Sequence, residues 1–179
     1  MFWRWGVLPV IVLLCGCSMP RIIVLNDPLD ARQHNDLGVA YEQRGEFDLA
    51  GREYRRAAAL DDKWARPLIN RGNIAARQGA WPSAAADYRE ALKRQPDNGE
   101  AMNNLAWALL QGQRPAEALP WALQAVAAAE NDPRCWDTLA DVYLKMGQAD
   151  AARQAIHRGL ALQPPPALRS SLEAKLPAE

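Results

Sequence analysis

Two histidines and a pair of adjacent aspartates are the first residues in which catalytic chemistry would be sought. His34 and His157 lie far apart in the sequence, and neither belongs to a motif such as HExxH, GxSxG, CxxC or a phosphate-binding loop. We expect His34 to be packed, His157 to be solvated, and Asp61 and Asp62 to lie in a turn. Since a catalytic centre needs an acid, base or nucleophile with supporting neighbours, the sequence predicts no enzyme, no metal site and no cofactor.

Three cysteines offer thiol chemistry, and their positions suggest different roles. Cys135 lies in a helical segment without a neighbouring histidine or basic pair, so we expect a small buried apolar side chain. Cys15 and Cys17 are too close together for a bridge that would stabilise a fold, and three cysteines are too few for a disulfide framework. Both belong to the opening stretch MFWRWGVLPVIVLLCGCSMP.

The opening stretch has the layout of an export signal. Arg4 supplies a positive charge, and an apolar run over residues 6–14 follows it. A helix needs about 20 apolar residues to cross a bilayer, so this run is too short to span one. Its end, LCGC at residues 14–17, resembles the lipobox of bacterial lipoproteins, in which a cysteine after a small residue accepts the lipid. A plain signal peptide and an uncleaved anchor are the alternatives.

The lipobox resemblance implies a signal peptide over residues 1–16, removed by cleavage, and a diacylglyceryl group on Cys17. Ser18, in place of aspartate, implies sorting to the outer membrane, with the protein facing the periplasm of a bacterial cell envelope. Acyl chains contribute about 0.8 kcal/mol for each buried methylene, so several chains on one residue form a firm membrane anchor. Residues 17–30 are then the acylated cysteine and a tether, in which Asp27 is expected to cap the first helix.

A repeat of 34 residues occupies most of the remaining chain. Blocks that begin at residues 31, 65, 99 and 133 tile the segment 31–166 without a gap. Small residues recur at positions 8, 20 and 27 of each block, namely Gly38, Gly72, Ala106 and Ala140, then Ala50, Ala84, Ala118 and Ala152, then Ala57, Ala91, Ala125 and Gly159. Alanine, at 33 of 179 residues, favours helix, so the pattern predicts an all-α chain.

This pattern resembles the tetratricopeptide repeat, whose small residues at positions 8, 20 and 27 let two antiparallel helices pack closely. The resemblance implies a solenoid of four helix-turn-helix repeats over residues 31–64, 65–98, 99–132 and 133–166, with helix A near positions 1–14 and helix B near positions 18–30. Stacked hairpins bury the apolar face that one hairpin leaves open, and the stack needs capped ends. Leucines at 168, 172 and 176 predict a C-terminal capping helix and tail within residues 167–179.

Individual positions refine this expectation. Gly45, Gly79 and Gly147 occupy position 15 of three blocks, where they are expected to end helix A. Arg71 takes the leucine position of the second block, so we expect its stem to pack and its charged head to reach solvent. Pro120 falls inside helix B of the third block, where it removes a helical hydrogen bond and is expected to bend or shorten the helix.

In solenoids of this family, helix A residues at positions 2, 5, 6, 9, 12 and 13 line the concave side, so the resemblance implies a binding groove there. Asn70 and Asn104 share position 6 and form a two-rung ladder, since an asparagine amide can both donate to and accept from an extended peptide. Arg66 and Arg134 are expected to hold carboxylates, and Trp107 to hold an apolar anchor. The candidate peptide-binding residues are Arg66, Asn70, Asn73, Asn103, Asn104, Trp107, Arg134 and Lys145.

Two other interpretations of these groove residues are open. Asparagine at positions 6 and 9 is common in this repeat and can serve hydrogen bonds between helices without any ligand. Asn73, Asn104 and Arg134 also resemble part of the carboxylate clamp with which some of these domains grip a chain terminus. Ile69 and Thr138 stand where that clamp has lysines.

The charge balance narrows the class of partner. Basic and acidic residues are equal in number, 21 of each, whereas nucleic-acid binding needs a surplus of lysine and arginine on one face. The charge balance therefore predicts no nucleic-acid partner. The resemblance to tetratricopeptide lipoproteins implies a non-enzymatic scaffold that binds proteins of the cell envelope, in support of pilus assembly, secretion pores or cell-wall hydrolases. An accessory of a cell-wall hydrolase or peptidase and a self-associating structural spacer are the alternatives.

Overall fold

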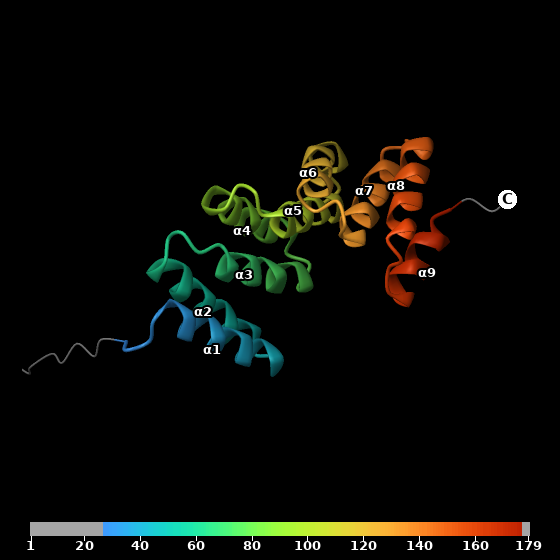
Figure 1. The fold of residues 1–179 in the computed structure, drawn as a ribbon. Coiled ribbons are helices and arrows are strands. Elements are labelled where there is room, and N and C mark those ends of the chain that lie inside the picture. Colours follow the sequence, from blue (N-terminus) through green and yellow to red (C-terminus); the bar gives the residue numbers. More distant parts are fainter. Residues whose placement is uncertain (1–26, 177–179) are drawn as a thin grey trace, which may run out of the picture.

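The computed structural model describes residues 27–176, and its helices stand in antiparallel pairs along a curved row (Figure 1). Helices A of the four repeats are α1 (Ala31–Gln43), α3 (Arg66–Arg77), α5 (Gly99–Gln111) and α7 (Pro133–Lys145). Helices B are α2 (Phe47–Leu60), α4 (Trp81–Arg94), α6 (Pro115–Ala128) and α8 (Ala149–Ala161), and α9 (Pro166–Ala174) follows. No strand occurs within residues 27–176. The predicted all-α solenoid of four hairpins and a C-terminal helix is confirmed.

The predicted signal peptide, the acylated Cys17 and most of the tether lie in residues 1–26, outside the described residues. Within residues 27–176, every helix is too short or too polar to cross a membrane.

The chain enters its first helix later than expected from the sequence. Asp27 accepts a hydrogen bond from the Leu29 amide (3.2 Å) and forms a local turn, so it does not cap α1. Asp30 is the cap. Its carboxylate accepts from the Gln33 amide (2.8 Å), and the Gln33 side chain accepts from the Asp30 amide (2.9 Å). This reciprocal pair satisfies amides that the first helical turn leaves without partners.

Each helix A is followed at position 15 by a residue with left-handed backbone. Gly45, Gly79 and Gly147 have φ angles of 76°, 71° and 73°, which confirms their predicted role in ending helix A. In the third repeat Gln113 takes this position with a φ of 60°, although a Cβ atom makes that conformation less favourable. All four hairpins share the turn, so the packing of the two helices imposes it even where glycine is missing.

The tightest contact inside the first two hairpins joins position 8 of helix A to position 24 of helix B. A Cβ atom added at Gly38 would lie 2.6 Å from Cε1 of Tyr54, and one added at Gly72 would lie 2.6 Å from Cε1 of Tyr88. Both tyrosines are buried. In repeats 3 and 4, position 8 is alanine and position 24 is the smaller alanine or isoleucine. In the first two repeats the ring at position 24 therefore limits position 8 to glycine, as expected in a close-packed interior.

The charged head of Arg71 is partly exposed, and it pairs with a carboxylate of α4 that the sequence did not predict. Its Nε donates to Asp87 Oδ2 of α4 at 2.8 Å, and its Nη2 donates to the other carboxylate oxygen. Asp87 is buried, and its hydrogen bond raises the pKa of the Arg71 guanidinium above the ordinary value. The head stays at the hairpin because a matching carboxylate from helix B compensates its partial burial.

Pro120 does not shorten α6, so this part of the expectation was wrong. The helix runs without a break over 14 residues, the same length as α2 and α4. The missing N–H of Pro120 would have bonded the carbonyl of Ala116, and both residues are exposed. Water can serve that carbonyl, which removes much of the usual cost of a proline inside a helix.

The last helix, α9, closes the C-terminal end of the stack by packing on α7 and α8. Leu172 is fully buried, and Leu168 and Leu176 pack against the same core. At the end of α9, Lys175 Nζ lies 2.6 Å from Asp137 Oδ1 of α7. The helix covers with leucines the apolar surface that a further repeat would otherwise cover.

The contact between positions 8 and 24 predicts a large effect of a single methyl group. We expect Gly72→Ala to lower the free energy of unfolding by about 1–3 kcal/mol, because the new Cβ overlaps the buried ring of Tyr88. Urea unfolding followed by circular dichroism measures this change. Gly51→Ala in α2 is the matched control, since no atom lies within 4 Å of its added Cβ, and it should stabilise the protein by up to about 1 kcal/mol. Equal effects of the two substitutions would contradict the assignment.

Candidate functional site

A hollow of about 300 Å³ lies across α1, α3 and α5, on the side of the solenoid formed by helices A. Three of the predicted groove residues, Asn73, Asn104 and Trp107, line it. The other lining residues are Glu42, Ala76, Arg77 and Tyr88. The fold therefore brings side chains from three successive repeats together in one concavity, which we call the groove hollow.

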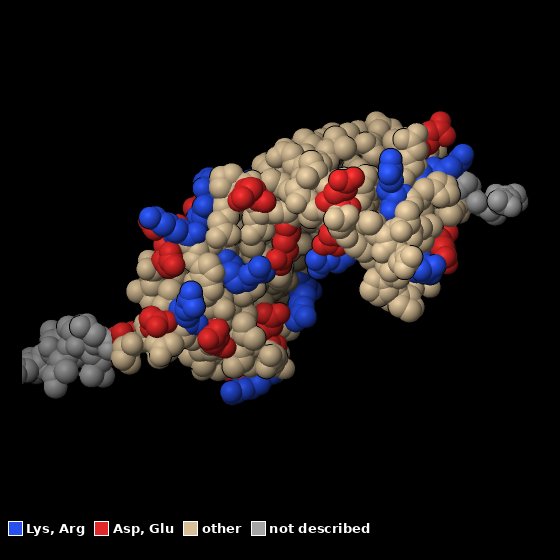
Figure 2. All heavy atoms as spheres, in the orientation of Figure 1, with Lys and Arg blue, Asp and Glu red and all other residues tan. Residues whose placement is uncertain are grey.

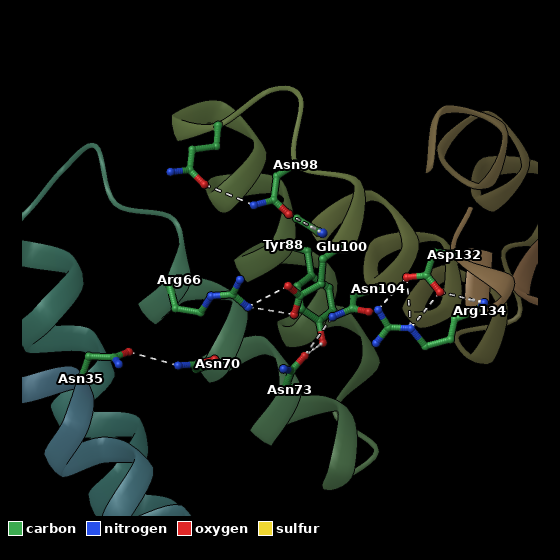
Figure 3. A network of polar contacts seen from close by, with 12 residues as sticks. Asn35, Arg66, Asn70, Asn73, Tyr88, Asn98, Glu100, Asn104, Asp132 and Arg134 are labelled. Carbon is green, nitrogen blue, oxygen red and sulfur yellow. Dashed lines mark hydrogen bonds and ion pairs between the residues drawn. The ribbon is translucent and has the colours of Figure 1, made fainter. Parts of the chain in front are cut away.

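The two ladder asparagines are joined to the neighbouring repeats by hydrogen bonds (Figure 3). Asn70 Nδ2 donates to Asn35 Oδ1 at 3.0 Å, and Asn104 Nδ2 donates to Asn73 Oδ1 at 3.1 Å. Each bond therefore links a helix A to the helix A of the preceding repeat. One amide hydrogen of each ladder asparagine is used in this way, and its second hydrogen and its oxygen provide the capacity to bind a peptide.

The hydroxyl groups of two helix B tyrosines reach the concave side and hold groove residues. Tyr88 donates to Asn73 Oδ1 at 2.7 Å, and Tyr54 donates to Glu42 Oε2 at 2.8 Å. Burial raises the pKa of both phenols, so they remain protonated donors at neutral pH. This role of the two tyrosines was not predicted from the sequence. The signal was present, since a tyrosine ring long enough to cross the hairpin faces glycine in both repeats.

The two predicted carboxylate-binding arginines are already paired with acidic residues. Arg66 Nη1 donates to both carboxylate oxygens of Glu100, at 2.9 and 2.7 Å, and so links α3 to α5 (Figure 3). Arg134 instead binds Asp132, the N-cap of its own helix, and this bond lowers the pKa of the Asp132 carboxyl group. Both arginines are exposed, so a partner's carboxylate can compete for them.

Trp107 is partly fixed by another tryptophan. Its ring meets that of Trp81 edge to face, with the ring centroids 5.1 Å apart and an interplanar angle of 86°. Trp81 begins α4, so the contact ties the groove to helix B of the second repeat. Trp107 therefore presents a supported ring to the groove hollow, and the support limits the entropy lost when a ligand packs on it.

Five of the eight candidates do not line the groove hollow, namely Arg66, Asn70, Asn103, Arg134 and Lys145. The Asn103 Oδ1 atom is buried and has no hydrogen-bond partner within the described part of the chain. Lys145 lines a separate hollow of about 470 Å³ with the C-terminal ends of α5 and α7. Beside it, Asp141 pairs with Lys175 of α9 at 2.8 Å, so the capping helix covers part of the fourth repeat's concave side. The structure therefore does not gather all eight candidates in one place.

The residues first considered for catalysis lie in surroundings that indicate structural roles. His34 is buried, with Nδ1 at 2.7 Å from Glu53 Oε2, and His157 is exposed. Burial raises the pKa of the Cys135 thiol to about 11, so it stays protonated and packs as a small apolar side chain, as predicted. Within residues 27–176, no group of histidine, cysteine, aspartate and glutamate side chains is arranged to hold a metal ion.

Charged side chains of both signs are interspersed over the surface seen in Figure 2. A face with clustered positive charge would favour binding to nucleic acid or to an anionic surface, since such binding needs clustered lysine and arginine. The mixed pattern in this view, with a formal net charge of zero, fits a surface that recognises proteins through local polar and apolar contacts.

The tetratricopeptide repeat model matches residues 21–63 and 69–133, and a second model of the same repeat matches residues 133–166. The chain belongs to the tetratricopeptide repeat family. Repeat proteins of this fold are generally non-catalytic scaffolds, and this chain is a tetratricopeptide scaffold for protein–protein interaction. The groove hollow therefore lies in an architecture built for binding other proteins.

One relative is the type IV pilus assembly protein PilF of Pseudomonas aeruginosa, whose name indicates its role. It is 31% identical over 130 residues, which cover 72% of this chain and 52% of PilF. The tetratricopeptide repeat-containing protein trd-1 of Caenorhabditis elegans is 29% identical over 141 residues, which cover 77% of this chain and 18% of trd-1. This chain thus spans about half of PilF and a smaller part of trd-1.

Solved structures share the solenoid. The structure of Pseudomonas aeruginosa PilF has a TM-score of 0.70 at 26% identity, over 83% of this chain and 74% of PilF. MamA from Desulfovibrio magneticus RS-1 has a TM-score of 0.71 at 23% identity, over 81% of this chain and 82% of MamA. YrrB, described as having an unusual peptide-binding site, has a TM-score of 0.68 at 22% identity, over 82% of this chain and 76% of YrrB. MamA and YrrB, below 25% identity, support the fold and nothing further.

The exposed ion pair between Arg66 and Glu100 predicts a small contribution to stability. We expect Arg66→Ala to lower the free energy of unfolding by less than about 1 kcal/mol in dilute buffer, and by nearly nothing in 1 M salt, because solvent and salt screen exposed charges. Urea unfolding at both salt concentrations measures the difference. A loss that is larger and independent of salt would show that Arg66 holds the repeats together and is not available to a partner.

Proposed function

We propose that this protein is a non-catalytic adaptor of the bacterial envelope that holds an extended peptide segment of a partner protein along its concave side. The observation that carries the proposal is the groove hollow, in which Asn73, Asn104 and Trp107 meet from successive helices A. A binding site for a peptide needs amide-binding groups beside an apolar surface, and this hollow supplies both.

The groove side chains suit an extended peptide for a specific reason. Asn70 and Asn104 repeat at the same position of adjacent repeats, and each keeps hydrogen-bonding capacity beyond its bond to the preceding repeat. A peptide backbone that crosses them finds a donor and an acceptor at each rung. Trp107 takes an apolar side chain of the peptide, and Arg66 exchanges Glu100 for a carboxylate of the partner.

The location that we propose is the periplasmic face of the outer membrane, with the anchor on Cys17. The LCGC end of the apolar leader and Ser18 after it support this location. The similarity to PilF, named as a type IV pilus assembly protein, supports a client in pilus or secretion assembly. A lipid anchor at one end of a rigid solenoid keeps the groove close to such a membrane-bound machine.

The test of the groove substitutes three of its residues and leaves the buried core residues unchanged. We expect the triple variant Asn70→Ala, Asn104→Ala and Trp107→Leu to lose partner proteins that the wild type captures from membranes of its native host, as identified by mass spectrometry. The control variant carries Gln124→Ala, Arg153→Ala and Gln154→Ala, three exposed residues of helices B, and should capture the same proteins as the wild type. Unchanged capture by a groove variant whose circular dichroism and melting are intact would refute the groove.

The anchor is tested separately. We expect Cys17→Ser to abolish incorporation of radiolabelled palmitate and to release the protein from the outer-membrane fraction, because the thioether needs that sulfur. The matched control is Cys15→Ser, which replaces the neighbouring thiol with a residue that suits this position and should leave both labelling and fractionation unchanged. Labelling of the Cys17→Ser variant would contradict the proposed anchor, whatever the outcome of the groove experiment.

A further inference from the structure

A larger hollow, of about 550 Å³, lies between α2, α3 and α4. Positions 7, 10 and 11 of α3 contribute to it, and the helical period places positions 7 and 11 on the opposite side of α3 from position 9 of the groove. We call it the outer hollow, bounded by Arg52, Arg55, Arg71, Ile74, Ala75 and Asp87. It is therefore separate from the groove hollow.

The fourth repeat provides an internal reference for this site. A hollow of about 270 Å³ between α6, α7 and α8 shares several lining positions with it, among them 7, 11, 19, 22 and 23. Positions 7 and 11 there are Leu139 and Tyr143, whereas in the second repeat they are Arg71 and Ala75. Position 11 is also tyrosine in the first repeat and leucine in the third. The outer hollow is thus about twice as large where a bulky residue is replaced by alanine.

The outer hollow combines charged side chains with a smaller apolar part, which Phe47, Ile74 and Ala75 form. Ile74 is 5% exposed and packs with Tyr54 in the core of the first repeat. Arg71 also lines the hollow, but its Nε and Nη2 donate to Asp87, which holds the guanidinium beside α4. The space therefore suits a large apolar side chain, since filling it removes apolar surface from water on both partners.

The rim of the outer hollow carries an excess of positive charge. Arg52 and Arg55 are exposed there, and neither forms an ion pair with another residue of the described range 27–176. Asp48 lies on the same rim, while the carboxylate of Asp87 is neutralised by Arg71. Two guanidinium groups facing one carboxylate attract a second acidic group, and guanidinium binds carboxylate through two parallel hydrogen bonds.

We propose that the outer hollow is a second binding site, which takes an aromatic side chain of a protein partner flanked by carboxylates. The partner's ring fills the volume that Tyr143 fills in the fourth repeat, and its carboxylates pair with Arg52 and Arg55. Because the outer hollow and the groove hollow lie on opposite sides of α3, the two sites can be occupied at once. The scaffold then joins two segments instead of holding one.

The experiment uses the full-length chain in a mild detergent and measures fluorescence anisotropy of a labelled, capped peptide that contains one phenylalanine followed by two aspartates. We expect the wild type to bind this peptide and Ala75→Tyr to bind it at least about tenfold more weakly, because the new ring occupies the pocket of the partner's ring. The double variant Arg52→Gln and Arg55→Gln should weaken binding and flatten its dependence on salt. The control Gln124→Ala, at an exposed residue of α6 that lines neither hollow, should bind as the wild type does.

Two further peptides and a stability measurement complete the test. Replacing the phenylalanine by glycine, or the aspartates by lysines, should each reduce binding at least about tenfold. Ala75→Tyr and Ala75→Leu should both melt within a few degrees of the wild type, since these residues occupy position 11 in other repeats. Undiminished binding by the Ala75 variants, equal binding of the lysine peptide, or no binding to the wild type would overturn the proposal. Unfolding of both Ala75 variants would also overturn it, because the hollow would then lack room for a side chain.

Discussion

The whole solenoid depends on how closely helices A and B of one repeat can approach each other. In the first two repeats that approach requires glycine at position 8, because the buried rings of Tyr54 and Tyr88 occupy the space that a Cβ atom would take. The same rings extend across the hairpin, so their hydroxyls reach Glu42 and Asn73 on the concave side. Packing and the polar groups of the groove are therefore coupled through single side chains, and the groove cannot change shape without disturbing the core.

The polar side chains of the concave side are largely engaged with one another before any partner arrives. The bonds from Asn70 to Asn35 and from Asn104 to Asn73 fix side-chain rotamers that a solvated asparagine would sample freely. A ligand that uses the remaining donors and acceptors binds side chains that folding has already ordered. Binding therefore loses less side-chain conformational entropy. Specificity then depends on how well the ligand matches groups that are held in place. The exposed ion pairs of the arginines add a contribution to binding that depends on the salt concentration.

The positions of the helices along the chain could be predicted because small residues recur at a constant interval. Such an interval is visible in a single sequence. The partner of Arg71 could not be predicted in the same way, since Asp87 belongs to no repeat pattern and meets it only after the hairpin closes. The asparagine bonds between repeats also needed coordinates, because the sequence leaves the choice of acceptor open. The sequence shows alanine at position 11 of the second repeat, Ala75, but it does not show whether neighbouring side chains fill the space that this small residue leaves. The length of α6 could not be predicted either, because the cost of Pro120 depends on how exposed the helix is to water.

The capping helix α9 limits how copies of this protein can be arranged. Its inner side is buried by Leu172, whereas Arg169, Ser170 and Glu173 face solvent. A second solenoid cannot stack on that end without burying these charges, so a head-to-tail filament has no favourable joint there. Contacts between copies of this chain are therefore disfavoured at the solvent-facing side of α9.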